Sequence, residues 1–201
     1  MTTLEEILRG RDDIGDAAAR AAERAVASAG TLGLTDVSYA FEPSPVGELL
    51  VAVTPRGLIR LAYNAHEQAD TVLEELARKV SPRVVEAPAA LDDVRRELDE
   101  YFEGRRKAFD IPVDWRLHDG FGRRVLRATA GIPFGKVLTY GEVATKAGSP
   151  RASRAAGNAL GSNRIPIVVP CHRVVRSGGK IGGYTGGVAR KEYLLDLEGV
   201  R

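Results

Sequence analysis

The only cysteine of the chain, Cys171, lies between a proline and a histidine in the stretch IPIVVPCHRVV, directly after an apolar run. Thiolate is the nucleophilic form of cysteine, and a free thiol with a pKa of about 8.5 is only slightly ionised at neutral pH. Nucleophilic chemistry at Cys171 would therefore need a base or a cation nearby. His172 is the adjacent base, but neighbouring side chains point in different directions on a strand or a helix. A bridging water would close the gap and let His172 act as a general base.

A histidine that acts as a base also needs a partner that holds its imidazole in the right tautomer, and a carboxylate can do this. The candidates downstream are Glu192, Asp196 and Glu198, and spacing alone does not choose among them. The competing interpretation is that Cys171 is a small buried apolar residue. One cysteine cannot form an internal disulfide, and three scattered histidines do not complete a four-ligand zinc site. We therefore expect neither redox exchange nor a bound metal.

The elements that position this stretch begin with a small α+β unit in the amino-terminal half. Two β-rich runs flank the turn residues 54–57 and predict a hairpin. Helical periodicity follows in residues 69–80 and 91–104. Residues 109–120 contain a proline and have mixed polarity, which indicates a connector. Ahead of this unit, a segment rich in Ala, Arg and Glu predicts a helix that ends at Gly30.

The carboxy-terminal half predicts helices within residues 120–132, 139–148 and 151–161. The last two helices flank a turn at Ser149-Pro150 and resemble a helix-turn-helix. In the final helix, small residues surround one long side chain, Arg154. Small residues let a helix backbone come close either to another helix in the core or to a DNA groove, where Arg154 could enter the base stack.

Charge changes sign at the connector. Residues 1–115 hold 14 Lys and Arg against 22 Asp and Glu, a net charge of −8, whereas residues 116–201 hold 15 against 5, a net charge of +10. A basic segment favours a polyanionic partner such as nucleic acid, and the alternative is a solubilising surface. No stretch approaches the roughly 18 apolar residues of a membrane helix, and the amino terminus has no basic leader followed by an apolar segment. We expect a cytoplasmic protein with no membrane partner.

These features predict an α+β fold in which a small amino-terminal α/β unit with a β-hairpin precedes a mostly helical carboxy-terminal domain that carries a helix-turn-helix. We place a helical extension at residues 1–35, an α+β domain at residues 36–112, and the DNA-binding and active-site domain at residues 113–201.

The stretch PCHRVV, residues 170–175, resembles the motif of the O6-alkylguanine-DNA alkyltransferases, also called methylated-DNA–protein-cysteine methyltransferases. The resemblance runs from about Val37 to the end of the chain and includes SPVGELLVAVTPRGLIRL, IPFGKVLTYGEVA, SRAAGNALGSN and GGYTGGVARKEYLLDLEG. It implies DNA repair by transfer of an alkyl group from guanine O6 to the protein, once per molecule and without a cofactor. It leaves open whether O4-alkylthymine is also a substrate and which alkyl groups are preferred.

The resemblance also implies roles for single residues. Cys171 attacks the alkyl carbon, and His172 and Glu198 form the water-bridged relay that activates it, which selects one of the three carboxylates that spacing left open. Asn163 ties neighbouring loops together and orients the site. Tyr140 crowds the phosphate of the flipped nucleotide and helps to protonate guanine N3. The product is a thioether with no good leaving group, so each molecule should act once.

The partner that the resemblance implies is double-stranded DNA with alkylated bases, approached from the minor groove. The lesion is flipped out of the duplex, and Arg154 fills the space it leaves. The predicted DNA contacts are Tyr140, Arg151, Ser153, Arg154 and Arg164. The predicted pocket residues are Val169, Pro170, Tyr184, Thr185 and Gly186, the last three from a glycine-rich lid at residues 182–187.

Three positions depart from the family pattern. Leu126 stands where a tryptophan is common, which indicates repacking. Arg164 stands where most relatives have proline, which affects the rigidity of its loop and adds a cation that could contact phosphate. Thr185 replaces a frequent serine or glycine and bears on pocket size. Three rival functions remain: a lesion binder, whose relatives lack the cysteine; a cysteine hydrolase that pairs Cys171 with His66 or His118; and a plain helix-turn-helix regulator. Self-association and the role of residues 1–35 stay open.

Overall fold

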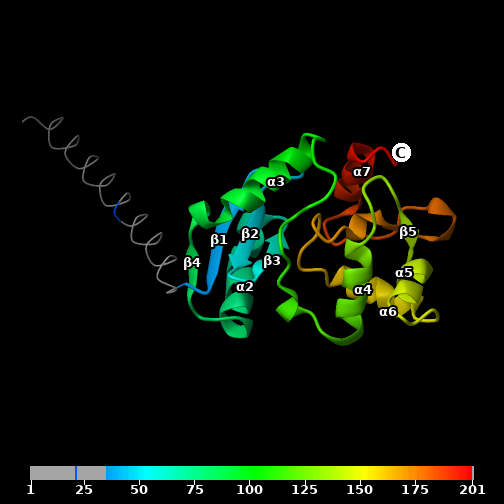
Figure 1. The fold of residues 1–201 in the computed structure, drawn as a ribbon, viewed down its shortest axis with the longest axis horizontal. Coiled ribbons are helices and arrows are strands. Elements are labelled where there is room, and N and C mark those ends of the chain that lie inside the picture. The colour runs from blue at the N-terminus through cyan, green and yellow to red at the C-terminus, as the bar shows by residue number, and fades with distance from the viewer. Residues whose placement is uncertain (1–20, 22–34, 201) are drawn as a thin grey trace, which may run out of the picture.

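The computed structural model describes Ala21 and residues 35–200. Except for Ala21, the helix expected before Gly30 lies outside the described residues. The rest of the chain forms a sheet unit followed by a mostly helical unit, which lie side by side (Figure 1). This arrangement confirms the predicted α+β class. Among the described helices, none is both long and apolar enough to cross a membrane.

The amino-terminal unit is built on a four-stranded sheet with the order β3-β2-β1-β4. Its strands are β1 (Val37–Glu42), β2 (Leu49–Thr54), β3 (Gly57–Ala62) and β4 (Val84–Glu86). The antiparallel pairing of β2 with β3 is the hairpin that the turn residues predicted. The short β4 pairs parallel to β1 and had no clear pattern in the sequence. The connector runs along β3, where Leu58 N donates to Pro112 O at 2.8 Å.

Helices cover both faces of this sheet. Helix α2 (Ala65–Lys79) places Val72 and Leu76 against buried residues of one face. The other face belongs to a larger core that continues through α3 (Asp92–Phe102) into the carboxy-terminal unit. Because alternate residues of each strand point to opposite faces, the hairpin contributes to both cores. The two units therefore share one continuous apolar interior.

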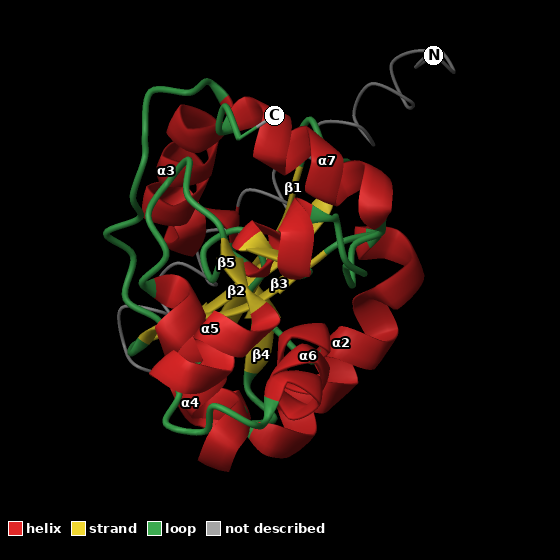
Figure 2. Ribbon diagram, turned by 90° about the vertical axis from the view of Figure 1, so that its right-hand side faces the viewer, coloured by secondary structure: helices red, strands yellow, loops and turns green. Residues whose placement is uncertain are grey.

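The carboxy-terminal unit is mostly helical (Figure 2). Its elements are α4 (Gly120–Ala130), β5 (Leu138–Thr139), α5 (Tyr140–Lys146), α6 (Ser153–Gly161), β6 (Val174–Val175) and α7 (Val188–Leu197). The strands β5 and β6 pair parallel through Leu138 with Val174 and Thr139 with Val175. This short pairing joins the start of α5 to the chain that directly follows Cys171.

Helices α5 and α6 form the predicted helix-turn-helix and pack on α4. Thr139 and Glu142 form a capping box that fixes the start of α5. On α6, Ala156, Ala159 and Leu160 are buried in the core, whereas Ser153 and Arg154 are exposed. The small residues thus allow close helix packing on one side and leave the Arg154 side chain on the surface.

Candidate active site

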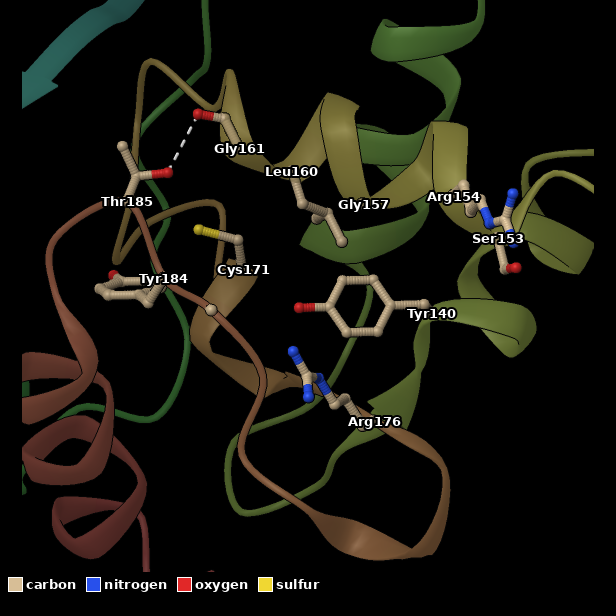
Figure 3. Close-up of a pocket in the computed structure, with 11 residues that line it drawn as sticks. Tyr140, Ser153, Arg154, Gly157, Leu160, Gly161, Cys171, Arg176, Tyr184 and Thr185 are labelled. Carbon is tan, nitrogen blue, oxygen red and sulfur yellow. Dashed lines mark hydrogen bonds between the residues drawn. The ribbon is translucent and has the colours of Figure 1, made fainter.

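Cys171 begins a short 3-10 helix, Cys171–Arg173, and lines a cavity of about 640 Å³ with its side chain only 6% exposed. Figure 3 shows Tyr140 and Tyr184 to either side of Cys171. The cavity is lined by Tyr140, Ser153, Arg154, Gly157, Leu160, Gly161, Cys171, Arg176, Gly183, Tyr184 and Thr185. The single thiol of the chain therefore faces a space that opens beside the helix-turn-helix.

Asn163 holds the sulfur in place. Its amide nitrogen donates to Cys171 Sγ at 3.1 Å and to Val169 O at 2.8 Å, while its carbonyl oxygen accepts from Ile165 N at 3.0 Å. Between these contacts the buried Ile167 adopts a φ of 73°, a conformation that β-branched residues rarely take. The Asn163 contacts bridge both ends of this turn and so fix the approach of the chain to Cys171.

His172 and Glu198 form a fully buried pair, with His172 Nε2 2.8 Å from Glu198 Oε1. Burial lowers the pKa of His172, and the contact with Glu198 opposes this shift. Burial alone would raise the pKa of Glu198, but hydrogen bonds from His172 and Arg173 lower it to about 2. Glu198 is therefore ionised and accepts the hydrogen on Nε2. The other nitrogen, Nδ1, is buried without a hydrogen bond to the described residues and is left as an acceptor.

Two residues that the sequence did not single out hold this carboxylate. Arg173 donates Nε to Glu198 Oε2 and Nη2 to Oε1, both at 2.9 Å, and is itself buried. Tyr101, at the end of α3, donates its hydroxyl to Oε1 at 2.7 Å. A buried ion pair is favourable only when its remaining hydrogen bonds are satisfied, and these donors satisfy them. The amino-terminal unit thus contributes directly to the site through Tyr101.

The groups around the thiol shift the pKa of Cys171 in opposite directions. Burial raises the pKa of Cys171, while the hydrogen bond from Asn163 and the charge of Lys191 lower it. Lys191, fully buried on α7, donates Nζ to Val174 O at 2.5 Å. A fixed cation close to the sulfur favours the thiolate. No pattern in the sequence distinguished this lysine from the others.

Tyr140 occupies the first turn of α5 and lies close to two glycines. A Cβ at Gly182 would lie 2.6 Å from the Tyr140 hydroxyl, so only glycine fits at that position of the lid. The ring also packs beside Gly157 of α6. Burial raises the pKa of Tyr140, which keeps the hydroxyl protonated at neutral pH. Its hydroxyl is therefore a proton donor at the cavity.

The predicted DNA contacts divide into two groups. Tyr140, Ser153 and Arg154 line the cavity, and Arg151 is exposed next to them. The side chain of Arg164 lies elsewhere, because its Nη1 is 2.5 Å from Glu75 Oε2 on α2. The cation at position 164 is thus already paired within the protein. Arg176, which the sequence did not single out, is exposed and lines the cavity.

Only some of the predicted pocket residues line the cavity. Tyr184 and Thr185 line the cavity, and the Thr185 hydroxyl donates to Gly161 O at 3.0 Å, which ties the lid to the end of α6 (Figure 3). Val169, Pro170 and Gly186 are buried and are not among the residues that line the cavity. Val169 instead presents its carbonyl oxygen to Asn163.

The histidines required by a hydrolase lie outside the cavity. His66 pairs with Glu48 at 2.5 Å and stacks on Phe41. His118 is buried beside Trp115, and burial lowers its pKa to about 4. Within residues 35–200, no group of three or more His, Cys, Asp or Glu side chains is placed to hold a metal ion. The groups that meet at the cavity suit a nucleophilic thiol served by one histidine.

Two protein-family models match the chain. The model described as 6-O-methylguanine DNA methyltransferase, ribonuclease-like domain, matches residues 37–115, and the DNA binding domain of the same name matches residues 120–200. Among curated relatives, a methylated-DNA–protein-cysteine methyltransferase of Mycolicibacterium paratuberculosis is 49% identical over 164 residues, which cover 81% of this chain and 92% of the relative. The constitutive enzyme of that name from Bacillus subtilis is 33% identical, with 80% and 94% covered.

Solved structures are also similar to this chain over most of its length. The crystal structure of Mycobacterium tuberculosis OGT in complex with DNA has a TM-score of 0.69 at 36% identity and covers 80% of this chain and 92% of that one. The O6-methylguanine-DNA methyltransferase of Pyrococcus kodakaraensis has a TM-score of 0.56 at 26% identity, with 82% and 99% covered. The similarity therefore extends over both units, including the segment that carries the thiol.

Proposed function

This chain belongs to the 6-O-methylguanine DNA methyltransferase family, and on that premise we propose how its own residues carry out the reaction. The protein repairs DNA by transferring an alkyl group from O6-alkylguanine to a cysteine, and Cys171 is the only cysteine it has. The observation that carries the proposal is the placement of this thiol in a cavity, in contact with Asn163 and next to the buried His172–Glu198 pair.

The first step activates the thiol. Glu198 holds the hydrogen of His172 on Nε2, so Nδ1 is the free acceptor. Through one bridging water, Nδ1 takes the thiol proton of Cys171, and the charge on Glu198 stabilises the resulting imidazolium. Asn163 and Lys191 stabilise the thiolate from two other directions. Arg173 and Tyr101 keep Glu198 ionised and fixed while the proton moves.

The second step is an in-line displacement at the alkyl carbon. The bond between sulfur and carbon forms as the bond between carbon and guanine O6 breaks, and the electron pair of the broken bond stays on the base. Tyr140 donates its proton to guanine N3 and recovers one from solvent, so the repaired base leaves neutral. His172 releases the proton it took from the thiol to solvent, so overall the thiol loses one proton and the base gains one. The product is a thioether that no second cysteine in this chain could resolve.

DNA binding places the lesion in the cavity. Relatives of this fold have been solved with DNA, and the basic carboxy-terminal half of this chain suits the same partner. We propose a minor-groove approach in which the exposed Arg154 enters the stack and the flipped guanine passes Ser153 to reach Cys171. Arg151 and Arg176 are exposed cations on this side and would contact phosphates. Arg164 contributes little, because Glu75 already neutralises it.

We also propose that Val169 and Pro170 act by shaping the chain behind the sulfur, since neither lines the cavity.

A cytoplasmic location fits a lone, unpaired thiol, which persists in a reducing compartment.

The test is a stoichiometry measurement with excess substrate. The protein is mixed with a several-fold molar excess of duplex carrying one O6-methylguanine, and repaired guanine is counted over time. Single-use transfer predicts a plateau at one equivalent per protein, with Cys171→Ala giving none. Continued turnover beyond one equivalent would contradict the proposal and favour a hydrolase. Tight lesion binding without repair would leave a damage-binding protein.

A further inference from the structure

Tyr63 brings the amino-terminal sheet to the wall of the alkyl pocket. It directly follows β3, and its side chain is only 6% exposed. It belongs to the core that the sheet shares with the carboxy-terminal unit. The next residue, Asn64, has a φ of 51° and begins the turn into α2, which fixes the backbone next to Tyr63.

The Tyr63 side chain contacts the lid at two points. Its hydroxyl is 2.7 Å from the hydroxyl of Tyr184, and the two ring centroids are 6.1 Å apart. A Cβ at Gly186 would lie 2.5 Å from the Tyr63 ring, so only a glycine leaves room for this aromatic residue. The glycine that the sequence placed in the pocket therefore makes space for Tyr63 behind it.

Arg190 contacts both the Tyr63 ring and the lid. Its guanidinium lies 5.0 Å from the centre of the Tyr63 ring, which is a cation–π distance. It also donates to Gly186 O at 2.9 Å on the lid and to Asn64 Oδ1 at 2.8 Å on the sheet unit. The lid is thus fastened to the amino-terminal unit around Tyr63, and Tyr184 has little freedom to move.

The hydroxyl groups of Tyr63 and Tyr184 are joined by one hydrogen bond. Burial raises the pKa of both Tyr63 and Tyr184, so both stay protonated. The bond between them uses one hydrogen. Either hydroxyl can donate the hydrogen of this bond, and the bond ties the sheet unit to the residue of the lid that lines the cavity.

We propose that Tyr63 is a positioning residue for alkyl transfer: its hydroxyl and its ring hold Tyr184 in the pocket wall, and this wall limits the size of the alkyl group. This inference rests on the proposed function and deepens it. It assigns part of the substrate selectivity to the amino-terminal unit.

The test compares three variants in single-turnover transfer. Tyr63→Phe keeps the ring and removes the hydroxyl, so Tyr184 loses its hydrogen bond to the sheet unit. We expect the ratio of O6-benzylguanine to O6-methylguanine transfer rates to rise about three-fold in this variant. Tyr63→Ala removes the support behind Tyr184, and we expect the ratio of O6-benzylguanine to O6-methylguanine transfer rates to rise about ten-fold. Tyr39→Phe removes a hydroxyl from β1 of the same sheet and is the matched control.

The outcomes separate this inference from the proposed function. If the wild type transfers no methyl group, the proposed function fails. If the wild type reacts and both Tyr63→Phe and Tyr63→Ala keep the substrate ratio of the wild type and of Tyr39→Phe, the positioning role is refuted. Circular dichroism checks folding, and if Tyr63→Ala does not fold, the substrate ratio of Tyr63→Phe decides the question.

Discussion

Replacing Tyr101 by phenylalanine tests the claim that the amino-terminal unit helps to set the state of the catalytic carboxylate. Tyr101 is fully buried and donates its hydroxyl to Glu198 Oε1 at 2.7 Å. A hydrogen bond to a charged group contributes about 1.5–3 kcal/mol. His172 and Arg173 still satisfy Glu198 in the variant, so we expect a loss near the lower end, about 2 kcal/mol in the free energy of unfolding at pH 7, measured with urea.

The same change should alter the pH dependence of repair with a defined sign. With one donor fewer, the Glu198 carboxylate attracts the imidazolium of His172 more strongly, and the pKa of His172 rises. The acid limb of the single-turnover rate profile should therefore move to higher pH. Tyr193→Phe on α7, where the hydroxyl is exposed, is the control. A stability loss below about 0.5 kcal/mol, or an acid limb that moves to lower pH, would refute the reasoning.

Three further predictions concern the thiol, the DNA and acid stability. Asn163→Ala removes the amide that donates to Cys171 Sγ, so single-turnover methyl transfer should slow by about ten-fold or more at pH 7; an unchanged rate in a rapid-quench assay would contradict this. Arg154→Ala should reduce the single-turnover rate on a duplex lesion by about ten-fold, because flipping the base costs a few kcal/mol. Arg123→Ala on α4 should leave this rate unchanged. Equal rates for the two variants would count against insertion of Arg154. The pKa of Glu198 is about 2 in the folded protein against 4.5 as its ordinary value, so the native state binds fewer protons and stability present above pH 4.5 is lost toward pH 2. That loss should amount to about 3 kcal/mol in urea unfolding, and a flat profile over this range would show that the carboxylate is not held as described.

Much of the fold follows from local patterns. The hairpin has turn residues between two β-rich runs, and the helices after it have clear periodicity, so both are predictable. Helix α2 begins at Ala65, four residues before the predicted range, and its N-cap residue Asn64 makes no side-chain cap hydrogen bond. The strands β4, β5 and β6 are two or three residues long and depend on partners distant in sequence. Such strands have too few residues to display a period.

The candidate site was likewise predictable only where its residues are adjacent in the sequence. The adjacency of Cys171 and His172 is visible in the sequence, but the choice of Glu198 came only from family resemblance. Tyr101 lies 97 residues from Glu198, and nothing local marks a tyrosine that will donate to a distant carboxylate. Arg173 resembles any other basic residue until the fold buries it against that carboxylate.

At position 164 the structure adds a contact that the sequence did not predict. A free cation in a loop near a predicted DNA-binding helix is a reasonable phosphate contact, but the fold brings Glu75 of α2 to within 2.5 Å of Arg164. Long-range pairing of charges depends on how the two units meet, and the sequence does not contain that geometry in any local form.

The most direct test of alkyl transfer to Cys171 is intact-mass spectrometry followed by peptide mapping after reaction with duplex DNA that carries one O6-methylguanine. Single-use transfer predicts a gain of one methylene mass per molecule, located on Cys171, with no further gain as DNA is increased and none in Cys171→Ala. A methyl group on any other residue, or repaired DNA with an unmodified protein, would contradict it.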